Sequence, residues 1–395
     1  MGGFQMRQVN IMMRELLKIF PRYQFEKIVD RHSGDRYVKY FTCWQQLITL
    51  LYSQISGKDS LRDIIISLNV HKNKWYHLGF KGIKRSTLSD SMNNRSYKIF
   101  EGLFYRLLGK CKRVTPKHKF KFRNPLYSLD STTIDLCLSI FPWAKFRKRK
   151  GAIKIHYLLD HGGCLPSFIT MTDGKVHDVM VAKNNTKLNF KLLPDSIIAF
   201  DKAYIDYDWL YRLNEKGVYF VTRVKNNIDC EFLGQHKPIQ DDNIEKDEII
   251  KLKGPQTSKK YPRKLRLVGF INPDDHKYYE FLTNNFEFKA RTIADIYRAR
   301  WEIEIFFKWI KQNLKIKSFL GTSPNAVLSQ VWVAMCYYLL LRYIKYQTRF
   351  AHSLKELHIM ISSVLMSKVN LIDILQLRVT TIAKARSPCK QISLF

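Results

Sequence analysis

Residues 126–225 carry the pattern that most restricts the fold of this chain. Stretches rich in apolar and β-branched residues, which indicate strands, alternate there with stretches of helical spacing. The order is three strands, a helix, a strand, a helix and a strand, and it predicts a mixed α/β sheet covered by helices. The predicted strands are residues 126–140, 152–160, 165–172, 196–204 and 218–224, and the predicted helices are 177–190 and 206–217.

Helical spacing dominates on both sides of this region. Residues 11–110 indicate several short helices, and those separated by the stretch "LGFKGIKRSTLSD" at 78–90 suggest a unit like a helix-turn-helix. Residues 226–288 are polar and β-like, with turns at "KGPQ" and "NPDD", and helices return from 290 to about 367. We therefore expect five segments. They are a helical domain (1–115), the first part of the α/β core (116–225), a β-rich insertion (226–288), the second part of the core (289–350) and a C-terminal helical segment with a loose tail (351–395).

One stretch, "AVLSQVWVAMCYYLLL" at 326–341, is apolar enough to resemble a membrane span. It contains Ser329 and Gln330, ends at Arg342, and is short for a bilayer. A buried core helix is the better interpretation, so no membrane partner is expected. Arg7 and Arg14 interrupt the apolar residues near the start of the sequence, which argues against a signal peptide.

The charge of the chain indicates a polyanionic partner. Its formal net charge is +33 over 395 residues, with a pI near 9.8, and its 46% hydrophobic residues indicate a folded protein. Nucleic acid is the first candidate and an acidic membrane the second. Residues 110–123, "KCKRVTPKHKFKFR", hold seven Lys or Arg and no acid, so we expect a linker that follows a phosphate backbone. A merely solvated basic loop is the alternative.

The seven cysteines do not suggest a disulfide framework. Their number is odd and no C-x-x-C pair occurs, which fits reduced thiols in a cytosol. We therefore expect a cytoplasmic protein, and the family resemblance described below implies a bacterial one associated with the nucleoid.

Two aspartates stand out in the α/β region. Asp130 lies in "SLDST", which we place at the end of the first strand, and Asp201 directly follows the apolar strand "IIAF". Carboxylates at these places project into the crevice at the carboxyl edge of a sheet.

A third acid, Glu304, lies in "DIYRARWEIEIFFKWIKQNLKI" at 295–316, which we expect to be one helix. On a helical wheel it shares a stripe about 20 Å long with Tyr297, Arg300 and Lys311. Lys308 and Lys315 border the stripe, and apolar residues lie on either side, so the stripe would line a cleft. An exposed Arg300–Glu304 ion pair on a solvated helix is the alternative.

Two aspartates and one glutamate make up a set of hard oxygen ligands suited to Mg²⁺ or Mn²⁺. Two such ions can stabilise the attacking and leaving oxygens of a phosphoryl transfer, and a basic chain would hold the polyanionic substrate. Other acids have plainer interpretations: Asp178 would cap a helix. The remaining candidates for caps or structural roles are Asp135, Asp160, Asp206, Asp208, His156, His161 and His177.

These residues resemble the DDE transposases of bacterial insertion sequences, in the large family (type four) marked by a Tyr-x2-Arg-x3-Glu-x6-Lys signature. Tyr297, Arg300, Glu304 and Lys311 match that signature position for position. "LDST" around Asp130 and "FDKAYIDYDWL" around Asp201 look like the family's first two acidic motifs. The resemblance covers roughly residues 10–345.

The resemblance implies a ribonuclease H-like catalytic core interrupted by a β-rich insertion, preceded by an all-helical DNA-binding domain and followed by C-terminal helices. Asp130, Asp201 and Glu304 would bind two Mg²⁺, with Mn²⁺ as a substitute. The enzyme would bind terminal inverted repeats, pair two ends in a homodimer, cleave the ends, and join each 3′-OH to target DNA. The signature residues Tyr297, Arg300 and Lys311, with neighbouring Lys308 and Lys315, would hold DNA phosphates.

One departure concerns a hairpin step that some relatives perform with a Trp in the β insertion. No Trp occurs here between Trp209 and Trp301. Any aromatic face can stack on a base, and the candidates are Tyr261, Phe270, Tyr278, Tyr279 and Phe281.

Two other classes of function remain open. A transposase-derived repressor would bind DNA without cleaving it, although the complete set of acids and the full signature argue against a decayed enzyme. A structural nucleic-acid-binding protein would explain the charge but not the acids.

Overall fold

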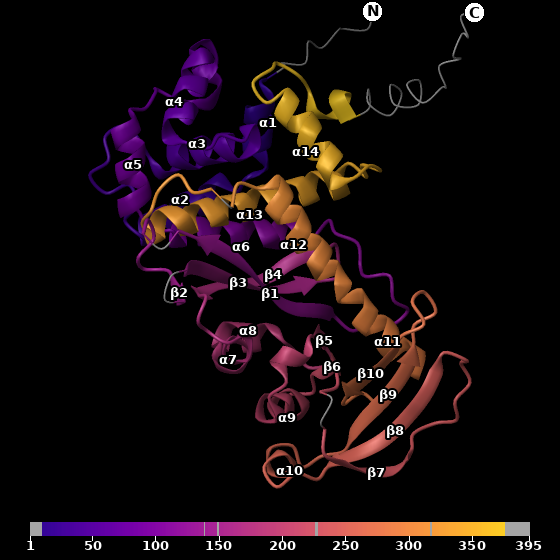
Figure 1. Ribbon diagram of the computed structural model, residues 1–395. Coiled ribbons are helices and arrows are strands. Elements are labelled where there is room, and N and C mark those ends of the chain that lie inside the picture. Colours follow the sequence, from indigo (N-terminus) through magenta and orange to yellow (C-terminus); the bar gives the residue numbers. More distant parts are fainter. Residues whose placement is uncertain (1–9, 138, 148–149, 226–227, 317, 376–395) are drawn as a thin grey trace, which may run out of the picture. The chain divides into compact units, whose positions relative to one another are not determined.

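The computed structural model describes residues 10–137, 139–147, 150–225, 228–316 and 318–375 (Figure 1). The chain forms two compact units. Residues 1–115 together with 310–395 are the helical unit, and residues 116–309 are the sheet unit. Arg7, one of the seven cysteines (Cys389) and the part of the C-terminal segment after residue 375 lie outside the described residues.

Helix α3 (Cys43–Ser56) illustrates how the sequence sets helix limits in the helical unit. The Thr42 hydroxyl accepts a hydrogen bond from the Gln45 N–H (3.3 Å), and the Gln45 side chain accepts one from the Thr42 N–H (3.3 Å). At the other end Gly57 adopts a left-handed φ of 67° and stops the helix. The other helices of this unit are α1 (Met12–Ile19), α2 (Arg22–Arg31), α4 (Leu61–Val70), η1 (Lys72–Leu78), α5 (Arg85–Asn94), α6 (Lys98–Lys112), α13 (Pro324–Gln347) and α14 (Leu354–Ser363).

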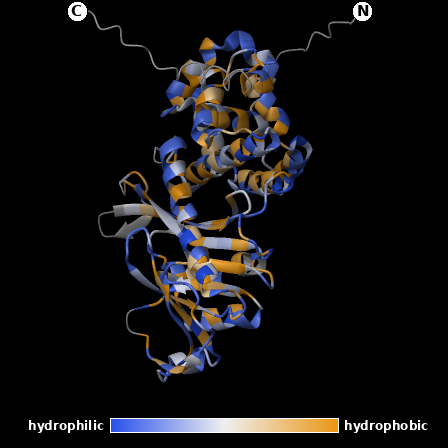
Figure 2. Ribbon diagram, turned by 90° about the vertical axis from the view of Figure 1, so that its right-hand side faces the viewer, coloured by the Kyte–Doolittle hydropathy of each residue, from blue (hydrophilic) through white to orange (hydrophobic). Residues whose placement is uncertain are grey.

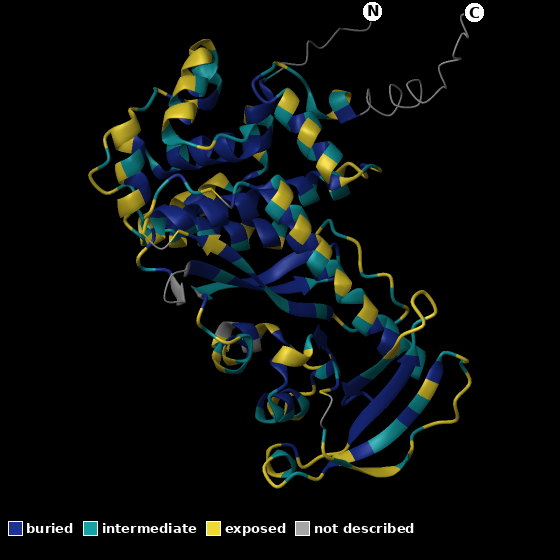
Figure 3. Cartoon of the chain, viewed as in Figure 1, coloured by how far each residue is buried: buried dark blue, intermediate teal, exposed yellow. Residues whose placement is uncertain are grey.

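Helix α13 is the core of the helical unit. The Ser323 hydroxyl caps it by accepting from the Ala326 N–H (3.2 Å), and the helix packs against α3, α5, α6 and α14. Of the described helices it alone is long and apolar enough to cross a membrane, and 83% of its most apolar window is buried in the protein. Figure 3 shows it largely in the colour of buried residues. The prediction of a buried core helix at 326–341 is therefore confirmed.

The helix-turn-helix suggested for residues 78–90 is not formed by that segment. Helix α4 ends at Val70 and α5 begins at Arg85, and the 3-10 helix η1 lies between them. A helix-turn-helix needs a turn of about three or four residues, so the connection is too long.

The sheet unit contains a ten-stranded mixed sheet in the order β2-β3-β1-β5-β6-β10-β9-β8-β7, with β4 paired to β3. β1, β3 and β4 are antiparallel neighbours, whereas β1, β5 and β6 run parallel. The predicted mixed α/β class is thus confirmed. The strands are β1 (Leu126–Leu136), β2 (Lys145–Arg147), β3 (Lys150–Asp160), β4 (Leu165–Asp173), β5 (Ile197–Phe200), β6 (Tyr219–Arg223), β7 (Cys230–Gln235), β8 (Ile244–Leu252), β9 (Leu265–Ile271) and β10 (Tyr278–Thr283).

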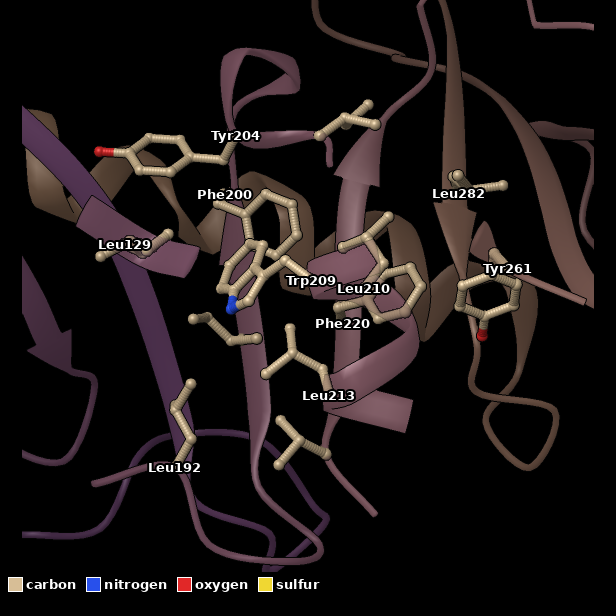
Figure 4. Packing of buried hydrophobic residues seen from close by; sticks show 14 of the residues in the cluster. Leu129, Leu192, Phe200, Tyr204, Trp209, Leu210, Leu213, Phe220, Tyr261 and Leu282 are labelled. Atoms are coloured by element: carbon tan, nitrogen blue, oxygen red, sulfur yellow. The ribbon is translucent and has the colours of Figure 1, made fainter. Parts of the chain in front are cut away.

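Both faces of the central strands are buried, because apolar side chains alternate between two cores. Ile198 and Phe200 of β5 join one core with Trp209 of α9 (Tyr207–Glu215), which Figure 4 shows from close by. Ile197 and Ala199 join the other core, against helix α11 (Ala290–Ala299). Figure 2 shows hydrophobic residues along the central strands as well as in the helices. The remaining helices of this unit are α7 (Asp178–Asn184), α8 (Thr186–Lys191), η2 (Lys202–Tyr204) and α10 (Thr257–Lys260).

Strands β7 to β10 continue the same sheet, since β10 pairs with β6. A buried ion pair holds this part together. Arg266 is fully buried and donates to both carboxylate oxygens of Asp247, at 2.7 and 2.8 Å. It also donates to the carbonyls of Asn285 (3.1 Å) and Phe288 (2.7 Å), which fixes the chain that leads into α11.

The segment 295–316, expected to be one helix, is instead divided between α11 and α12 (Trp301–Asn313). Arg300 is the turn residue between them. The Arg300 N–H donates to the Tyr297 carbonyl and the Ile303 N–H donates to the Arg300 carbonyl, both at 3.0 Å. These bonds span three residues rather than four, so the helix tightens locally and the stripe drawn on a continuous wheel is interrupted.

The basic segment after α6 is more than a linker. Phe120 and Phe122 pack on the core of the sheet unit, and the Phe122 ring stacks on Phe288 with centroids 4.8 Å apart. The aromatic residues thus anchor a segment whose lysines were expected to follow DNA.

Candidate active site

The parallel register of β1 and β5 places Asp130 and Asp201 at equivalent positions on neighbouring strands. Leu129 pairs with Phe200, and each aspartate is the next residue. Asp130 is not at the end of its strand as expected, because β1 continues to Leu136 along β3. Asp201 follows β5 and caps the short helix η2, accepting from the Ala203 N–H at 3.0 Å.

Glu304 and Arg300 reach the same region from the α11–α12 junction. The Arg300 guanidinium donates to Asp130 Oδ2 at 3.2 Å and to Glu304 Oε1 at 2.6 Å. Its side chain is only 11% exposed. The Arg300–Glu304 pair that we considered on a solvated face is therefore present, but it lies in a largely buried site and includes Asp130.

Burial is the main influence on Asp130. It raises the pKa of this carboxyl to about 6, and the Ser131 N–H and the Arg300 guanidinium oppose the rise. The Ser131 N–H donates to Asp130 Oδ1 at 2.7 Å. Asp130 is thus a partly desolvated carboxylate that needs a nearby positive charge.

Within the described ranges, no three His, Cys, Asp or Glu side chains lie close enough together to hold a metal ion. The Arg300 guanidinium lies between two of the three expected ligands. The donor set still fits a hard divalent ion, because Asp130, Asp201 and Glu304 offer only carboxylate oxygens. A cation already bridges Asp130 and Glu304, so the place is one that favours positive charge.

Tyr297 borders a cavity of about 290 Å³ beside Asp201. Its ring packs on Phe281 with centroids 4.9 Å apart, and the Arg300 guanidinium lies 5.5 Å from its centroid. Arg223 and the half-buried Tyr279 also line this cavity. Of the five aromatic residues considered above, Tyr261, Phe270 and Phe281 are buried, which leaves Tyr278 and Tyr279 with exposed ring surface.

The expected DNA-binding lysines are divided between the units. Lys308 is exposed on α12 within the sheet unit. Lys311 and Lys315 belong to the helical unit, where Lys315 donates to Asp59 Oδ1 at 2.8 Å. Within the sheet unit, Arg300 contacts both Asp130 and Glu304, and its guanidinium lies over the Tyr297 ring.

Asp178 was expected to cap a helix, and this was wrong. His177 is the residue before α7, and Asp178 is the first residue of that helix. The Asp178 carboxylate accepts from the Ser131 hydroxyl and from Lys154 Nζ, both at 2.7 Å. His156 Nδ1 lies 3.4 Å from it. Asp178 therefore supports β1 directly beside Asp130. The sequence around it indicated only the start of a helix.

A second polar network, also missed from sequence, ties β1 to α12. Ser128 Oγ lies 2.7 Å from His161 Nε2, and His161 Nδ1 lies 3.2 Å from Glu302 Oε2. The Cys164 thiol donates to the same glutamate oxygen at 3.1 Å. Ser128 and Glu302 each precede a candidate ligand, Asp130 and Glu304, by two residues. We call Ser128, His161 and Glu302 the β1–α12 tether.

Comparison with known proteins assigns the chain to a family. Residues 121–340 match the family model described as a transposase DDE domain. The chain therefore belongs to the DDE transposases, and its curated relatives come from bacterial insertion sequences. Residues 8–81 match a second family, described as a domain of unknown function (DUF4372).

Two relatives illustrate the similarity. The chain is 30% identical over 269 residues to the probable transposase for insertion sequence element IS5377 of Geobacillus stearothermophilus, covering 67% of this chain and 68% of that protein. It is 33% identical over 259 residues to the putative transposase y4zB of Sinorhizobium fredii, covering 65% and 70%. A solved piggyBac transposase synaptic complex with hairpin DNA is 12% identical, with a TM-score of 0.45 and coverage of 96% and 84%; similarity at that level carries no weight for function.

Proposed function

We propose that this protein is a transposase that binds the terminal inverted repeats of an insertion sequence, cleaves the DNA at the element ends and joins the 3′-OH ends to target DNA. The observation that carries the proposal is the meeting of Asp130 and Glu304 at one guanidinium, with Asp201 following the neighbouring parallel strand. This arrangement occurs in a chain of the DDE transposase family.

The topology of the sheet supports a ribonuclease H-like core. Three antiparallel strands, β1, β3 and β4, are extended on the other side of β1 by the parallel strands β5 and β6. Asp130 lies on β1, Asp201 directly follows the parallel strand β5, and Glu304 lies on α12, the helix that follows the β-rich insertion and α11. Helices α8 and α9 cover one face and α11 covers the other.

Asp130, Asp201 and Glu304 are the residues that would hold divalent ions, Mg²⁺ first and Mn²⁺ as a substitute. Such ions supply electrostatic stabilisation to the attacking and leaving oxygens of a phosphoryl transfer. The protein itself contributes the orientation of the carboxylates, through the Ser131 N–H and the β1–α12 tether.

Arg300 would change partners when DNA binds. Its planar guanidinium can bind a phosphate through two N–H groups as well as it binds carboxylates. Tyr297 would donate one hydrogen bond to the same DNA end, and Lys308, Lys311 and Lys315 would add positive charge. Double-stranded DNA and a second copy of this chain are the proposed partners.

The cavity beside Asp201 bears on a hairpin intermediate. Tyr279 lines it, and the Arg223 guanidinium lies 5.0 Å from the Tyr279 ring. If a flipped base is held during the reaction, Tyr279 is the aromatic residue of the insertion that is best placed to stack on it.

A plasmid assay tests the proposal. A supercoiled plasmid that carries the element's ends is incubated with the protein in Mg²⁺, Mn²⁺, Ca²⁺ or EDTA. We expect cleavage at the ends in Mg²⁺ and Mn²⁺, and binding alone in Ca²⁺, which takes more ligands at longer distances. Robust cleavage in EDTA would contradict the metal mechanism. Binding without cleavage in every metal would instead favour a transposase-derived repressor.

A further inference from the structure

A large basic hollow lies in the helical unit. It has a volume of about 1200 Å³ and is formed by the loop after α2, by the residues around η1, and by α5 with the loop before it. The bases that line it are Arg36, Lys39, Lys81, Lys84 and Arg95, and its acidic residue is Asp90. We call this hollow the α2–α5 groove. Much of it belongs to the stretch that matches a family of unknown function.

Four of the five bases are available to a ligand. Arg95 is already bound within the protein. It donates to Gln46 Oε1 (3.0 Å) and to the Phe41 carbonyl, and it lies 3.6 Å from Asp35. In contrast, Arg36, Lys39, Lys81 and Lys84 are exposed, and no carboxylate of the described ranges forms an ion pair with them. Unpaired cations gathered around one hollow create a positive potential that attracts an anion.

The loop after α2 also presents aromatic rings to solvent. Tyr40 lines the groove and is 73% exposed, and Tyr37 on the same loop is 87% exposed. Tyr37 adopts a left-handed φ of 60°, a conformation that is uncommon for a residue with a large side chain. Arg36 lies over the Tyr37 ring at 4.9 Å. The run "RYVKY" thus alternates cations with aromatic faces.

This loop is held by its own hydrogen bonds. The Asp35 carboxylate accepts from the Cys43 N–H at 2.7 Å, and the Val38 N–H donates to the Asp35 carbonyl at 3.1 Å. The Gly34 N–H donates to the Val29 carbonyl at 2.9 Å. The two tyrosines are therefore kept in water by an ordered loop, although exposed aromatic surface gives no stability to the free protein.

We propose that the α2–α5 groove binds DNA that contains unpaired bases, with Lys39, Lys81 and Lys84 on the phosphates and Tyr40 stacked on a base. Cations alone would suit any polyanion, including an acidic peptide. Exposed rings among the cations favour a nucleic acid strand, because every base offers a face for stacking. The choice of DNA as the nucleic acid rests on the proposed function.

The test uses the full chain carrying Glu304→Gln, in EDTA, so that no cleavage occurs. Fluorescence anisotropy measures binding to a labelled single strand, to the duplex of the same sequence, and to the single strand in competition with polyglutamate. The groove variant combines Lys39→Gln, Lys81→Gln and Lys84→Gln. The control variant combines Lys98→Gln, Arg106→Gln and Lys355→Gln, three exposed bases of the same unit that do not line the groove.

For the single strand, we expect the plot of log affinity against log salt to be less steep by about 2 in the groove variant. Three phosphate contacts are lost, and each contributes about 0.7 to the slope. At about 0.1 M salt that corresponds to roughly 100-fold weaker binding. The control variant should lose much less. Tyr40→Ala should weaken single-strand binding about tenfold and leave duplex binding unchanged, whereas Tyr40→Phe should bind normally.

If the groove and control variants lose equal affinity for the single strand at equal thermal stability, the α2–α5 groove is not the binding site. Normal single-strand binding by Tyr40→Ala would contradict the proposed stacking of Tyr40 on a base. Polyglutamate that competes as well as DNA at equal charge would mean that the groove accepts any polyanion. These outcomes are separate from the proposed function, because a protein that cleaves element ends can lack this groove activity, and a groove that binds DNA does not require cleavage.

Discussion

At the scale of single residues, Arg300 is the centre of the candidate site. It neutralises two carboxylates at once, which is why a desolvated Asp130 and a nearby Glu304 can coexist before any ion is bound. If Asp130 and Glu304 hold a divalent ion as proposed, Arg300 would have to release at least one of these carboxylates.

We predict that Mg²⁺ raises the melting temperature of Arg300→Ala more than that of the unchanged protein, since the variant leaves two carboxylates without a cation. In the absence of Mg²⁺ the variant should lose about 1–3 kcal/mol of stability. Thermal melts with and without Mg²⁺ measure both. Tyr297→Phe, which keeps the guanidinium, is the control and should respond to Mg²⁺ like the unchanged protein. An equal Mg²⁺ response in all three would mean that no ion takes the place of Arg300.

Part of the candidate site could be predicted at this scale. Asp130 and Asp201 follow apolar strand residues, and Glu304 belongs to a signature of fixed spacing, so the sequence sufficed to select them. The bridge from Arg300 to Asp130 joins residues 170 positions apart. A helical wheel cannot show such a contact, because it treats the helix as continuous and isolated. Asp178 was misjudged for a similar reason: it begins helix α7, whereas its partners, Ser131 and Lys154, lie on strands β1 and β3.

At the scale of elements, the β1–α12 tether connects the strand of Asp130 to the helix of Glu304. Ser128 and His161 are buried, so their hydrogen bond is shielded from water. This connection could not be recognised in the sequence, since it joins a strand, a turn and a helix that are remote along the chain.

We predict that His161→Ala raises the Mg²⁺ concentration needed for half-maximal cleavage, because the two ligand-bearing elements lose their common support. The variant should also lose about 1–3 kcal/mol of stability, as it leaves buried polar groups unpaired. Cys164→Ala, which removes the thiol contact to Glu302 and keeps Ser128, His161 and Glu302 themselves, is the matched control. A lower melting temperature with an unchanged Mg²⁺ requirement would mean that the tether stabilises the fold and does not position the ligands.

The buried pair in the insertion allows a second prediction at this scale. Asp247→Ala should lower the free energy of unfolding by about 3–5 kcal/mol, because it leaves the fully buried Arg266 without its carboxylate. Urea denaturation measures the loss. The exposed pair of Arg22 and Glu26 provides the control, since Glu26→Ala should cost less than about 1 kcal/mol. Similar losses of unfolding free energy in both variants would show that the buried ion pair contributes no more to stability than the exposed one.

At the scale of the whole molecule, the helices at the two ends of the sequence form one unit. α13 is buried against α3, α5 and α6, so residues 1–115 alone would expose the surface that α13 covers. The helical spacing of apolar residues in 11–110 could be recognised in the sequence. The packing of these helices against α13, more than two hundred residues later, could not, because helical periodicity indicates a buried face but not which element covers it.

We therefore predict that a fragment of residues 1–115 aggregates or shows no cooperative melting, and that sequence-specific binding of the element's end has to be tested in the full chain. Circular dichroism melts and light scattering of the fragment decide this. The full chain under the same conditions is the control. A soluble fragment with a sharp melting transition would show that α13 is dispensable for the N-terminal helices.

The central claim is that Asp130, Asp201 and Glu304 together perform metal-dependent cleavage at the element's ends. The most direct measurement is single-turnover cleavage of a plasmid carrying those ends by Asp130→Asn, Asp201→Asn and Glu304→Gln, with end binding followed by gel shift on the same preparations. The account predicts that each variant binds the ends like the unchanged protein and yields no cleavage product. Cleavage at a near-normal rate by any one of them would contradict the claim for that residue, and by all three would contradict the account.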